Sequence, residues 1–179
     1  MTNAELAILT LIAEKPRHGY EIEQVIEERG MREWTEVGFS SIYYLLKKLE
    51  EKNLIQGHME RQAGRGPARK VYEITEAGMD ARRAGVLEAL SVPQRAYPPM
   101  QLGLASLPGV SRSEALAALR RYQDRLKDRL EHVRSRRDDR RPLPYFVEAM
   151  FSHSMALIEA EQRWTEGFIV QLEETSDKD

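Results

Sequence analysis

The spacing of apolar residues between 38 and 53 predicts an amphipathic helix. Apolar side chains recur at intervals of three and four residues, the period of an α-helix, at Ile42, Leu45, Leu46 and Leu49. A rotation of about 100° per residue places a different set on the opposite face, namely Ser40, Tyr44, Lys47 and Glu51. The first two turns therefore carry hydroxyls and an ammonium group, whereas the last turn is acidic.

The preceding residues predict two shorter helices. Thr2 and Glu5 form a capping-box pattern ahead of an apolar run, which predicts a helix over about 3–14 that ends before Pro16. The segment 20–30 has apolar residues on one face and a terminal glycine, so it predicts a second helix with a glycine C-cap.

The residues after the amphipathic helix predict a β-hairpin. Apolar residues alternate over 54–62 and again over 71–75, and a Gly- and Pro-rich turn separates the two strands. Thr75 is placed to cap a further helix that runs to about Leu90. Three helices followed by a hairpin is the order of a winged helix-turn-helix domain, which we place at 1–90. Recognition helices of such domains insert their N-terminal ends into DNA.

The second half of the chain predicts a helical hairpin. Three prolines between 91 and 99 mark a break, so we assign 91–110 to a linker with a short helix. A capping box at Ser111 opens a long helix, and a second long helix spans about 145–174. The fold class predicted is therefore mainly α: an N-terminal winged helix-turn-helix with a two-stranded wing, plus a C-terminal antiparallel helical hairpin at 111–179.

The last helix carries more apolar surface than one partner helix can cover. Two interpretations are open: the stripe is the internal core of the hairpin, or it also buries against a second copy of the chain. We favour the second, which predicts a homodimer. The residues expected to contribute to dimerisation are Phe146, Met150, Phe151, Leu157, Ile158, Trp164 and Phe168.

Charge and composition narrow the class of partner. The 179 residues carry a net charge of −2, which argues against a protein that coats nucleic acid without selectivity. Between 61 and 70, however, there are four basic residues and no acidic one. A local basic patch on a nearly neutral body is typical of a sequence-selective binder of double-stranded DNA.

Several other classes are excluded or disfavoured. The chain has no cysteine, which excludes disulfides, thiolate zinc sites and cysteine nucleophiles, and fits a reducing compartment. The apolar run over 7–13 is too short for a membrane span or a secretory signal, and acidic residues flank it too closely. We therefore expect a cytoplasmic protein with no membrane partner.

The sequence contains no recognisable catalytic or metal site. His18, His58, His132 and His153 show no paired ligand spacing, and none belongs to a recognisable catalytic motif. There is also no phosphate-binding glycine loop. We predict no catalytic residues, no metal, no cofactor and no enzymatic activity.

The predicted DNA contacts come from the amphipathic helix and from the hairpin. An exposed lysine is ordinarily just solvated, and a serine at a helix start can be only an N-cap, although cap amides also bind phosphates. An arginine between two glycines can enter a narrow minor groove, or belong to an ordinary charged loop. The candidates are Ser40, Ser41, Tyr43, Tyr44, Lys47, Lys48, Arg65, Gly66, Arg69 and Lys70.

Three motifs in combination resemble the PadR family of bacterial transcriptional regulators. They are His18-Gly19-Tyr20-Glu21-Ile22, then Ser41-Ile42-Tyr43, then Lys70-Val71-Tyr72 with Ile74-Thr75-Glu76-Ala77-Gly78. The segment 145–164 resembles the dimerisation domain of the larger PadR subfamily. The resemblance implies a homodimeric winged-helix repressor that reads an inverted-repeat operator, and a small-molecule effector that can loosen DNA binding through the C-terminal helices.

The chain departs from the family pattern at two positions. Tyr44 stands where members often carry proline, which adds a backbone donor and a phenol and leaves the operator sequence open. Asn53 stands where glycine is usual, and asparagine tolerates the left-handed conformation of a helix C-cap.

Two alternatives to a simple DNA-binding regulator stay open at this stage. The second helix is acidic, with Glu21, Glu23, Glu27 and Glu28, which fits a helical protein-interaction module whose winged helix no longer binds DNA. A ligand sensor that uses Trp34 or Trp164 is compatible with DNA binding, although both tryptophans can equally be core residues.

Overall fold

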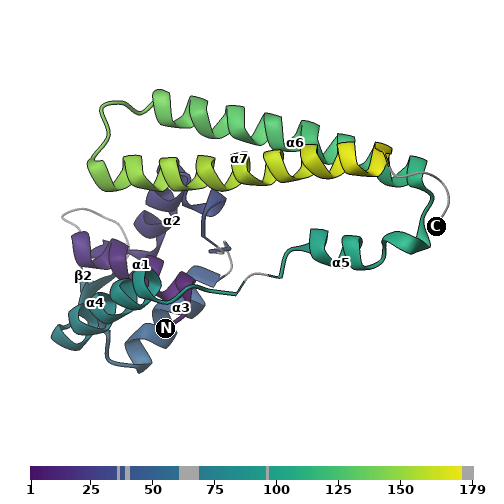
Figure 1. The fold of residues 1–179 in the computed structure, drawn as a ribbon. Helices are drawn as coiled ribbons and strands as arrows, with labels where there is room; N and C mark the ends of the chain where they lie inside the picture. The colour runs from purple at the N-terminus through teal and green to yellow at the C-terminus, as the bar shows by residue number, and fades with distance from the viewer. Residues whose placement is uncertain (36, 39–40, 61–68, 96, 175–179) are drawn as a thin grey trace. The chain divides into compact units, whose positions relative to one another are not determined.

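The chain folds into two compact units, residues 1–95 and 96–179. The structure is a computed structural model (Figure 1), and it describes residues 1–35, 37–38, 41–60, 69–95 and 97–174. It is mainly helical, with a small antiparallel sheet in the first unit and a long helical hairpin in the second. The fold class predicted from the sequence is confirmed.

The N-terminal unit has the element order of a winged helix. Its helices and strands are α1 (Asn3–Glu14), β1 (Arg17–His18), α2 (Gly19–Glu28), the 3-10 turn η1 (Met31–Glu33), α3 (Ser41–Glu51), β2 (Ile55–Glu60), β3 (Arg69–Ile74) and α4 (Glu76–Ser91). The helix ends follow the predicted caps. The Thr2 side chain accepts a hydrogen bond from the Glu5 amide while Glu5 accepts one from the Thr2 amide, which is the capping box that the sequence indicates.

The core of this unit is formed where α1, α2, α3 and β2 meet. Apolar residues at helical spacing on each helix point inward because only one face of each is apolar. The most deeply buried are Ile8, Leu9, Leu11, Ile12, Ile22, Ile26, Ile42, Leu46, Leu49 and Ile55. Packing of α3 on α1 and α2 leaves the opposite face of α3 exposed to solvent.

The sheet has three strands in the order β1-β3-β2, one more than predicted. The additional strand β1 has two residues, and it pairs antiparallel with β3 so that Arg17 faces Tyr72 and His18 faces Val71. Two residues show no alternation, so the sequence pattern cannot reveal such a strand. This pairing brings the start of α2 beside the wing strand β3.

Two helix ends require a left-handed backbone. Asn53, after α3, has a φ of 56°, and Gly30, after α2, has a φ of 60°. Glycine reaches this region without strain, and asparagine is among the residues that tolerate it. Both predicted C-cap conformations are therefore present, and Asn53 replaces glycine without changing the turn into β2.

The C-terminal unit is dominated by two antiparallel helices that lie side by side (Figure 1). It begins with α5 (Pro99–Ala105) and the 3-10 turn η2 (Leu107–Gly109), followed by α6 (Arg112–Asp138) and α7 (Tyr145–Glu174). The predicted capping box at Ser111 is present, because its hydroxyl accepts a hydrogen bond from the Glu114 amide. At the open end of the hairpin Arg112 donates to the Leu172 carbonyl at 2.7 Å.

The seam of the hairpin buries only part of its apolar surface. Leu126 and Leu130 of α6 pack with Ile158 of α7. Tyr122, half-buried beside them, donates to Glu161, and burial together with this hydrogen bond raises the pKa of Tyr122 to about 12. Several apolar residues of α7 that do not pack on α6 remain exposed.

Candidate nucleic-acid interface

The exposed face of α3 carries the side chains predicted to contact DNA. Tyr43, Tyr44 and Lys47 are all exposed, and Lys47 is the most accessible, with 77% of its side chain open to solvent. Its Nζ lies 3.8 Å from a carboxylate oxygen of Glu51, one turn further along the helix. An exposed pair of this kind is weak, so it leaves the ammonium group available to a phosphate or a base edge.

Lys48 lies on a different side of α3 from Lys47. Its Nζ is 3.2 Å from Oε1 of Glu5 on α1, and Lys52 donates to the same oxygen at 2.7 Å. Glu5 is buried, and its hydrogen bonds stabilise the charged form. Burial alone would raise the pKa of Glu5, but the hydrogen bonds from Lys52, the Thr2 amide and Lys48 outweigh it and lower the pKa to about 2. Lys48 thus has a structural partner that the sequence pattern did not indicate.

The start of α3 is only partly described. The Ser41 hydroxyl donates to the Gly38 carbonyl at 2.6 Å, so its proton is engaged within the chain. Three further predicted contacts, Ser40, Arg65 and Gly66, lie outside the described residues.

Arg69 and Lys70 belong to the wing strand β3, which begins two residues earlier than predicted. Lys70 donates to Oε2 of Glu50 on α3 at 2.7 Å, and this hydrogen bond raises the pKa of Lys70. The other Glu50 oxygen accepts the Gly57 amide of β2 at 3.2 Å. One carboxylate therefore joins the recognition helix to both wing strands.

Gly57 leaves the space that this arrangement needs. A Cβ there would lie 2.1 Å from Cε of Lys70 and 2.8 Å from Oε1 of Glu50. Any larger residue at this position would displace the lysine or the carboxylate.

A concavity of about 430 Å³ lies between α2, α3 and β3, and we refer to it as the tyrosine concavity. The residues that line it are His18, Gly19, Tyr20, Tyr43, Arg69, Lys70 and Tyr72. Burial raises the pKa of Tyr72, and Lys70 Nζ lies 5.3 Å from the centre of its ring. Sequence reasoning did not assign His18, Tyr20 or Tyr72 to the interface, because the pairing of β1 with β3 is what brings them there.

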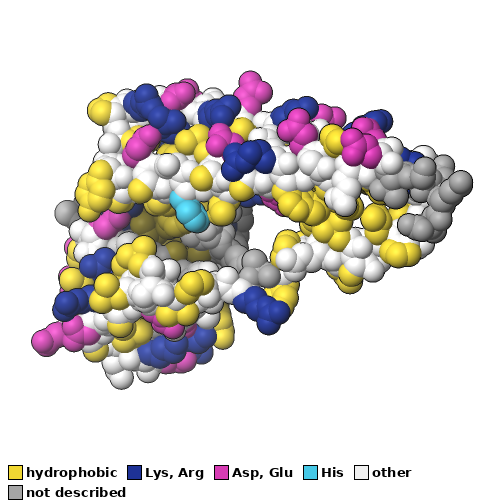
Figure 2. Space-filling view, in the orientation of Figure 1, with side chains coloured by type: hydrophobic (Ala, Val, Ile, Leu, Met, Phe, Trp, Pro, Cys, Tyr) yellow, Lys and Arg dark blue, Asp and Glu magenta, His cyan; other side chains and the backbone are white. Residues whose placement is uncertain are grey.

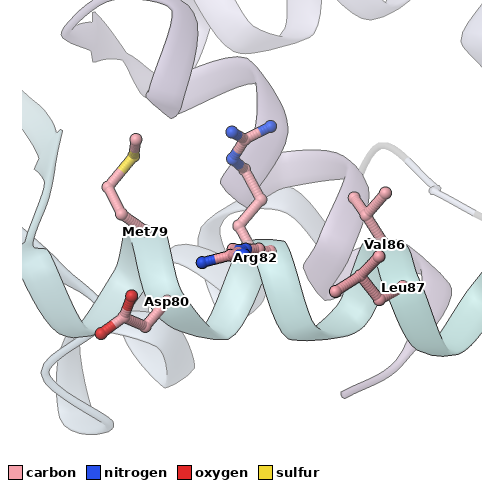
Figure 3. A pocket seen from close by; sticks show the side chains of 6 residues that line it. Met79, Asp80, Arg82, Val86 and Leu87 are labelled. Carbon is pink, nitrogen blue, oxygen red and sulfur yellow. The ribbon is translucent and has the colours of Figure 1, made fainter.

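A second depression, of about 360 Å³, lies along α4 (Figure 3). Met79, Arg82 and Val86 project to one side of the helix, and Asp80 projects to the other (Figure 3). The described residues that line it all come from α4, so they supply no opposing wall. This depression is a weaker candidate for a ligand site than the tyrosine concavity, whose lining residues come from β1, α2, α3 and β3.

The described residues contain no group of three or more histidine or acidic side chains that could hold a metal ion. In the same part of the chain, no helix combines the length and the apolar character that a bilayer crossing requires.

The predicted dimerisation residues of α7 differ in burial and form three groups. Ile158 is buried against α6, which fits the internal-core interpretation for this one residue. Phe151 and Phe168 are half-buried, and Trp164 stacks on Phe168 with ring centres 5.3 Å apart. The exposed remainder, which we call the α7 stripe, consists of Phe146, Met150, Leu157 and Trp164. In the view of Figure 2, charged side chains gather along the α6 edge of the hairpin and hydrophobic ones along its other edge.

The fold and this surface define a winged-helix protein with an exposed recognition helix beside a basic wing strand. Residues 8–84 match the model of the "Transcriptional regulator PadR-like family". The N-terminal unit of the chain is thus similar to this family. An uncharacterized protein X of Lysinibacillus sphaericus is 37% identical over 71 residues, which are 40% of this chain and 63% of that protein. The match thus spans less than two thirds of the curated relative.

Solved structures of similar fold cover nearly the whole chain. Bacillus subtilis PadR in complex with operator DNA superposes with a TM-score of 0.75 at 20% identity, over 94% of this chain and 98% of that one. The same protein in complex with p-coumaric acid gives 0.74 at 19% identity, over 96% of each chain. The PadR-like regulator BC1756 of Bacillus cereus gives 0.66 at 16% identity, over 96% and 97%. At such identities the likeness establishes the fold.

The family is one of transcriptional regulators and not of enzymes. The comparisons therefore confirm both the suspected family and the prediction that the chain is not an enzyme.

Proposed function

We propose that this chain is a transcriptional repressor that binds a specific DNA operator as a homodimer. The observation that carries the proposal is the exposed face of α3 with Tyr44 and Lys47, on a helix that the Lys70–Glu50 ion pair joins to the basic start of β3. A helix of this polarity suits the major groove, and a basic strand beside it suits the flanking phosphates. Bacillus subtilis PadR, a protein of the same fold, has been solved in complex with operator DNA, which supports DNA binding by this chain.

The homodimer is proposed from the α7 stripe. Four large apolar side chains on one helix are exposed in the single chain, and exposed apolar patches of this kind usually mark an interface. A twofold dimer would present two copies of α3, so its operator would be an inverted repeat of two half-sites. The dimerisation residues proposed are the α7 stripe with Phe151 and Phe168.

A small-molecule effector that releases the DNA is the third part of the proposal. Bacillus subtilis PadR has been solved with p-coumaric acid, which supports an effector for a chain of the same fold. Trp164 is exposed within the α7 stripe, so its fluorescence reports changes at the proposed dimer surface. A compound that lowers operator affinity while leaving Trp164 emission unchanged would count against signalling through this helix.

The proposal is tested by selecting duplexes from a random DNA library with the full-length chain at physiological salt. The expected outcome is enrichment of an inverted repeat, with log affinity falling linearly with log salt. Recovery of unrelated sequences, with no enriched half-site, would contradict sequence-specific binding. Repression is tested separately with a reporter gene behind the selected operator, whose expression should fall when the protein is present.

A further inference from the structure

The tyrosine concavity has a composition that suits one particular ligand group. Its described lining residues include two cationic side chains, Arg69 and Lys70, and three phenols, but no carboxylate. Two acidic groups near it have partners within the chain, because Glu21 accepts the His18 amide at 2.8 Å and Glu50 accepts Lys70 and Gly57. Glu60 lies opposite Arg69 in the β2–β3 ladder, but among the described residues Arg69 forms no ion pair, so its guanidinium can pair with an anion from outside.

Two of the phenols offer hydrogen-bond donors at the mouth of the concavity. Tyr20 and Tyr43 are exposed, and neither hydroxyl bonds to another described residue of the chain. The Tyr43 ring packs against Gly19, where an added Cβ would lie 2.7 Å from Cε1 of the ring. A donor on a ring that is already positioned loses little conformational entropy when it binds.

We propose that the tyrosine concavity seats one phosphate group of the DNA backbone, which accepts hydrogen bonds from Tyr20 and Tyr43 and pairs with Arg69. This inference rests on the proposed function and names a contact of the same surface. The concavity joins the recognition helix to the wing strand, and a DNA strand that passes between these elements places its backbone there. One cation that forms no ion pair among the described residues, together with two hydroxyl donors, matches the single charge and the free oxygens of one phosphodiester.

A contact with a phosphate fixes the position of the protein along the duplex, but it does not distinguish one base sequence from another. Removal of either hydroxyl should weaken binding to all duplexes by a similar factor, because phosphates are the same in every sequence. The α3 side chains that reach base edges should behave differently and change the preference among sequences. The tyrosine concavity therefore positions α3 on the DNA and does not select the base sequence.

The test is a double-mutant cycle between protein hydroxyls and single DNA phosphates. Tyr20→Phe and Tyr43→Phe keep the rings and remove only the hydroxyls, and the DNA partner is the library-selected duplex with one methylphosphonate at each position in turn. Each variant should bind the unmodified duplex about three- to tenfold more weakly than wild type. At one phosphate position the methylphosphonate should weaken each variant clearly less than it weakens wild type, because the variants have already lost one hydrogen bond to that phosphate but keep Arg69.

Tyr145→Phe, which removes an exposed hydroxyl from the start of α7, is the control and should bind like wild type. The proposal is overturned if both variants bind like wild type, or if the two losses add at every phosphate position. Such a result would leave the proposed sequence-specific binding by the wild-type protein untouched. If wild type selects no duplex at all, the proposed function fails and the phosphate seat fails with it.

Discussion

The ring of Tyr43 on α3 lies so close to Gly19 at the start of α2 that a methyl group there would come within 2.7 Å of its Cε1. Gly19 also follows β1 directly, so it is the point where strand pairing, the start of α2 and the recognition helix meet. The absence of a side chain at Gly19 therefore positions an exposed phenol on the proposed DNA-binding face.

Gly19→Ala should disturb this phenol more than it disturbs the fold. The Tyr43 ring can pivot away from the methyl group, so we expect a loss of about 1 kcal/mol in unfolding free energy and a fall of about tenfold in operator affinity. Thermal melting and a binding titration give the two values. Gly103→Ala, in α5 where a Cβ meets nothing within 4 Å, is the control and should leave operator affinity unchanged without lowering stability, because alanine is the better helix former.

Lys47 and Lys48 should separate binding from stability. Lys47→Ala should weaken operator binding and reduce the slope of log affinity against log salt by about one unit, because one phosphate contact is lost. Lys48→Ala should leave that slope nearly unchanged and lower the melting temperature, since Lys48 pairs with buried Glu5. Titrations at four or more salt concentrations and thermal melts measure both effects. The reverse pattern would contradict the assignment of the two faces.

Because of Glu5, the unfolding free energy should depend on pH in the acidic range. Its pKa is about 2 in the folded chain and 4.5 ordinarily, so its charged form stabilises the fold above pH 4.5 and loses this contribution as the pH falls towards 2. The shift corresponds to roughly 3 kcal/mol at neutral pH. Glu5→Gln should thus lower the unfolding free energy clearly at pH 7 and much less at pH 3. Denaturant unfolding at the two pH values measures the difference, and an equal loss at both would contradict this role.

Lys70 should act on DNA binding partly through Glu50. Lys70→Ala leaves the Glu50 carboxylate unpaired beside the proposed path of the DNA, so affinity should fall about tenfold or more. Adding Glu50→Gln to Lys70→Ala removes the repulsion and should recover most of the loss. Binding titrations of the single and double variants measure the recovery. A double variant that binds no better than Lys70→Ala would mean that the direct contact of Lys70 dominates.

The α7 stripe should determine the oligomeric state. Leu157→Asp places a charge in the stripe and should convert the proposed dimer to a monomer, because a buried unpaired carboxylate is strongly unfavourable. Val170→Asp is the matched control, an exposed apolar residue of the same helix about 140° around its axis. Light scattering after size-exclusion chromatography measures the mass. A dimer that survives Leu157→Asp and not Val170→Asp would place the interface on the other face.

Local signals in the sequence predicted the elements well. The capping boxes at Thr2 and Ser111 and the left-handed residue Asn53 are properties of a few neighbouring residues, so pattern and composition suffice to find them. The periodicity of α3 likewise identified which of its residues are buried.

The details of the candidate site depend on contacts that no local pattern carries. The pairing of β1 with β3 joins residues more than fifty positions apart, and this pairing creates the tyrosine concavity. Lys47 and Lys48 look alike as neighbouring lysines, and only the packing of α1 shows that Glu5 engages one of them. Likewise, Lys70 was assigned to a basic patch, but its charge is matched by Glu50 from another element.

The account depends most on the claim that α3 and the start of β3 bind DNA together. The most direct measurement is the salt dependence of binding to the library-selected duplex for wild type and for the double variant Lys47→Ala with Arg69→Ala. We predict a linear fall of log affinity with log salt for wild type, and a slope shallower by about two units for the double variant. Identical affinities and slopes for the two proteins would contradict the account.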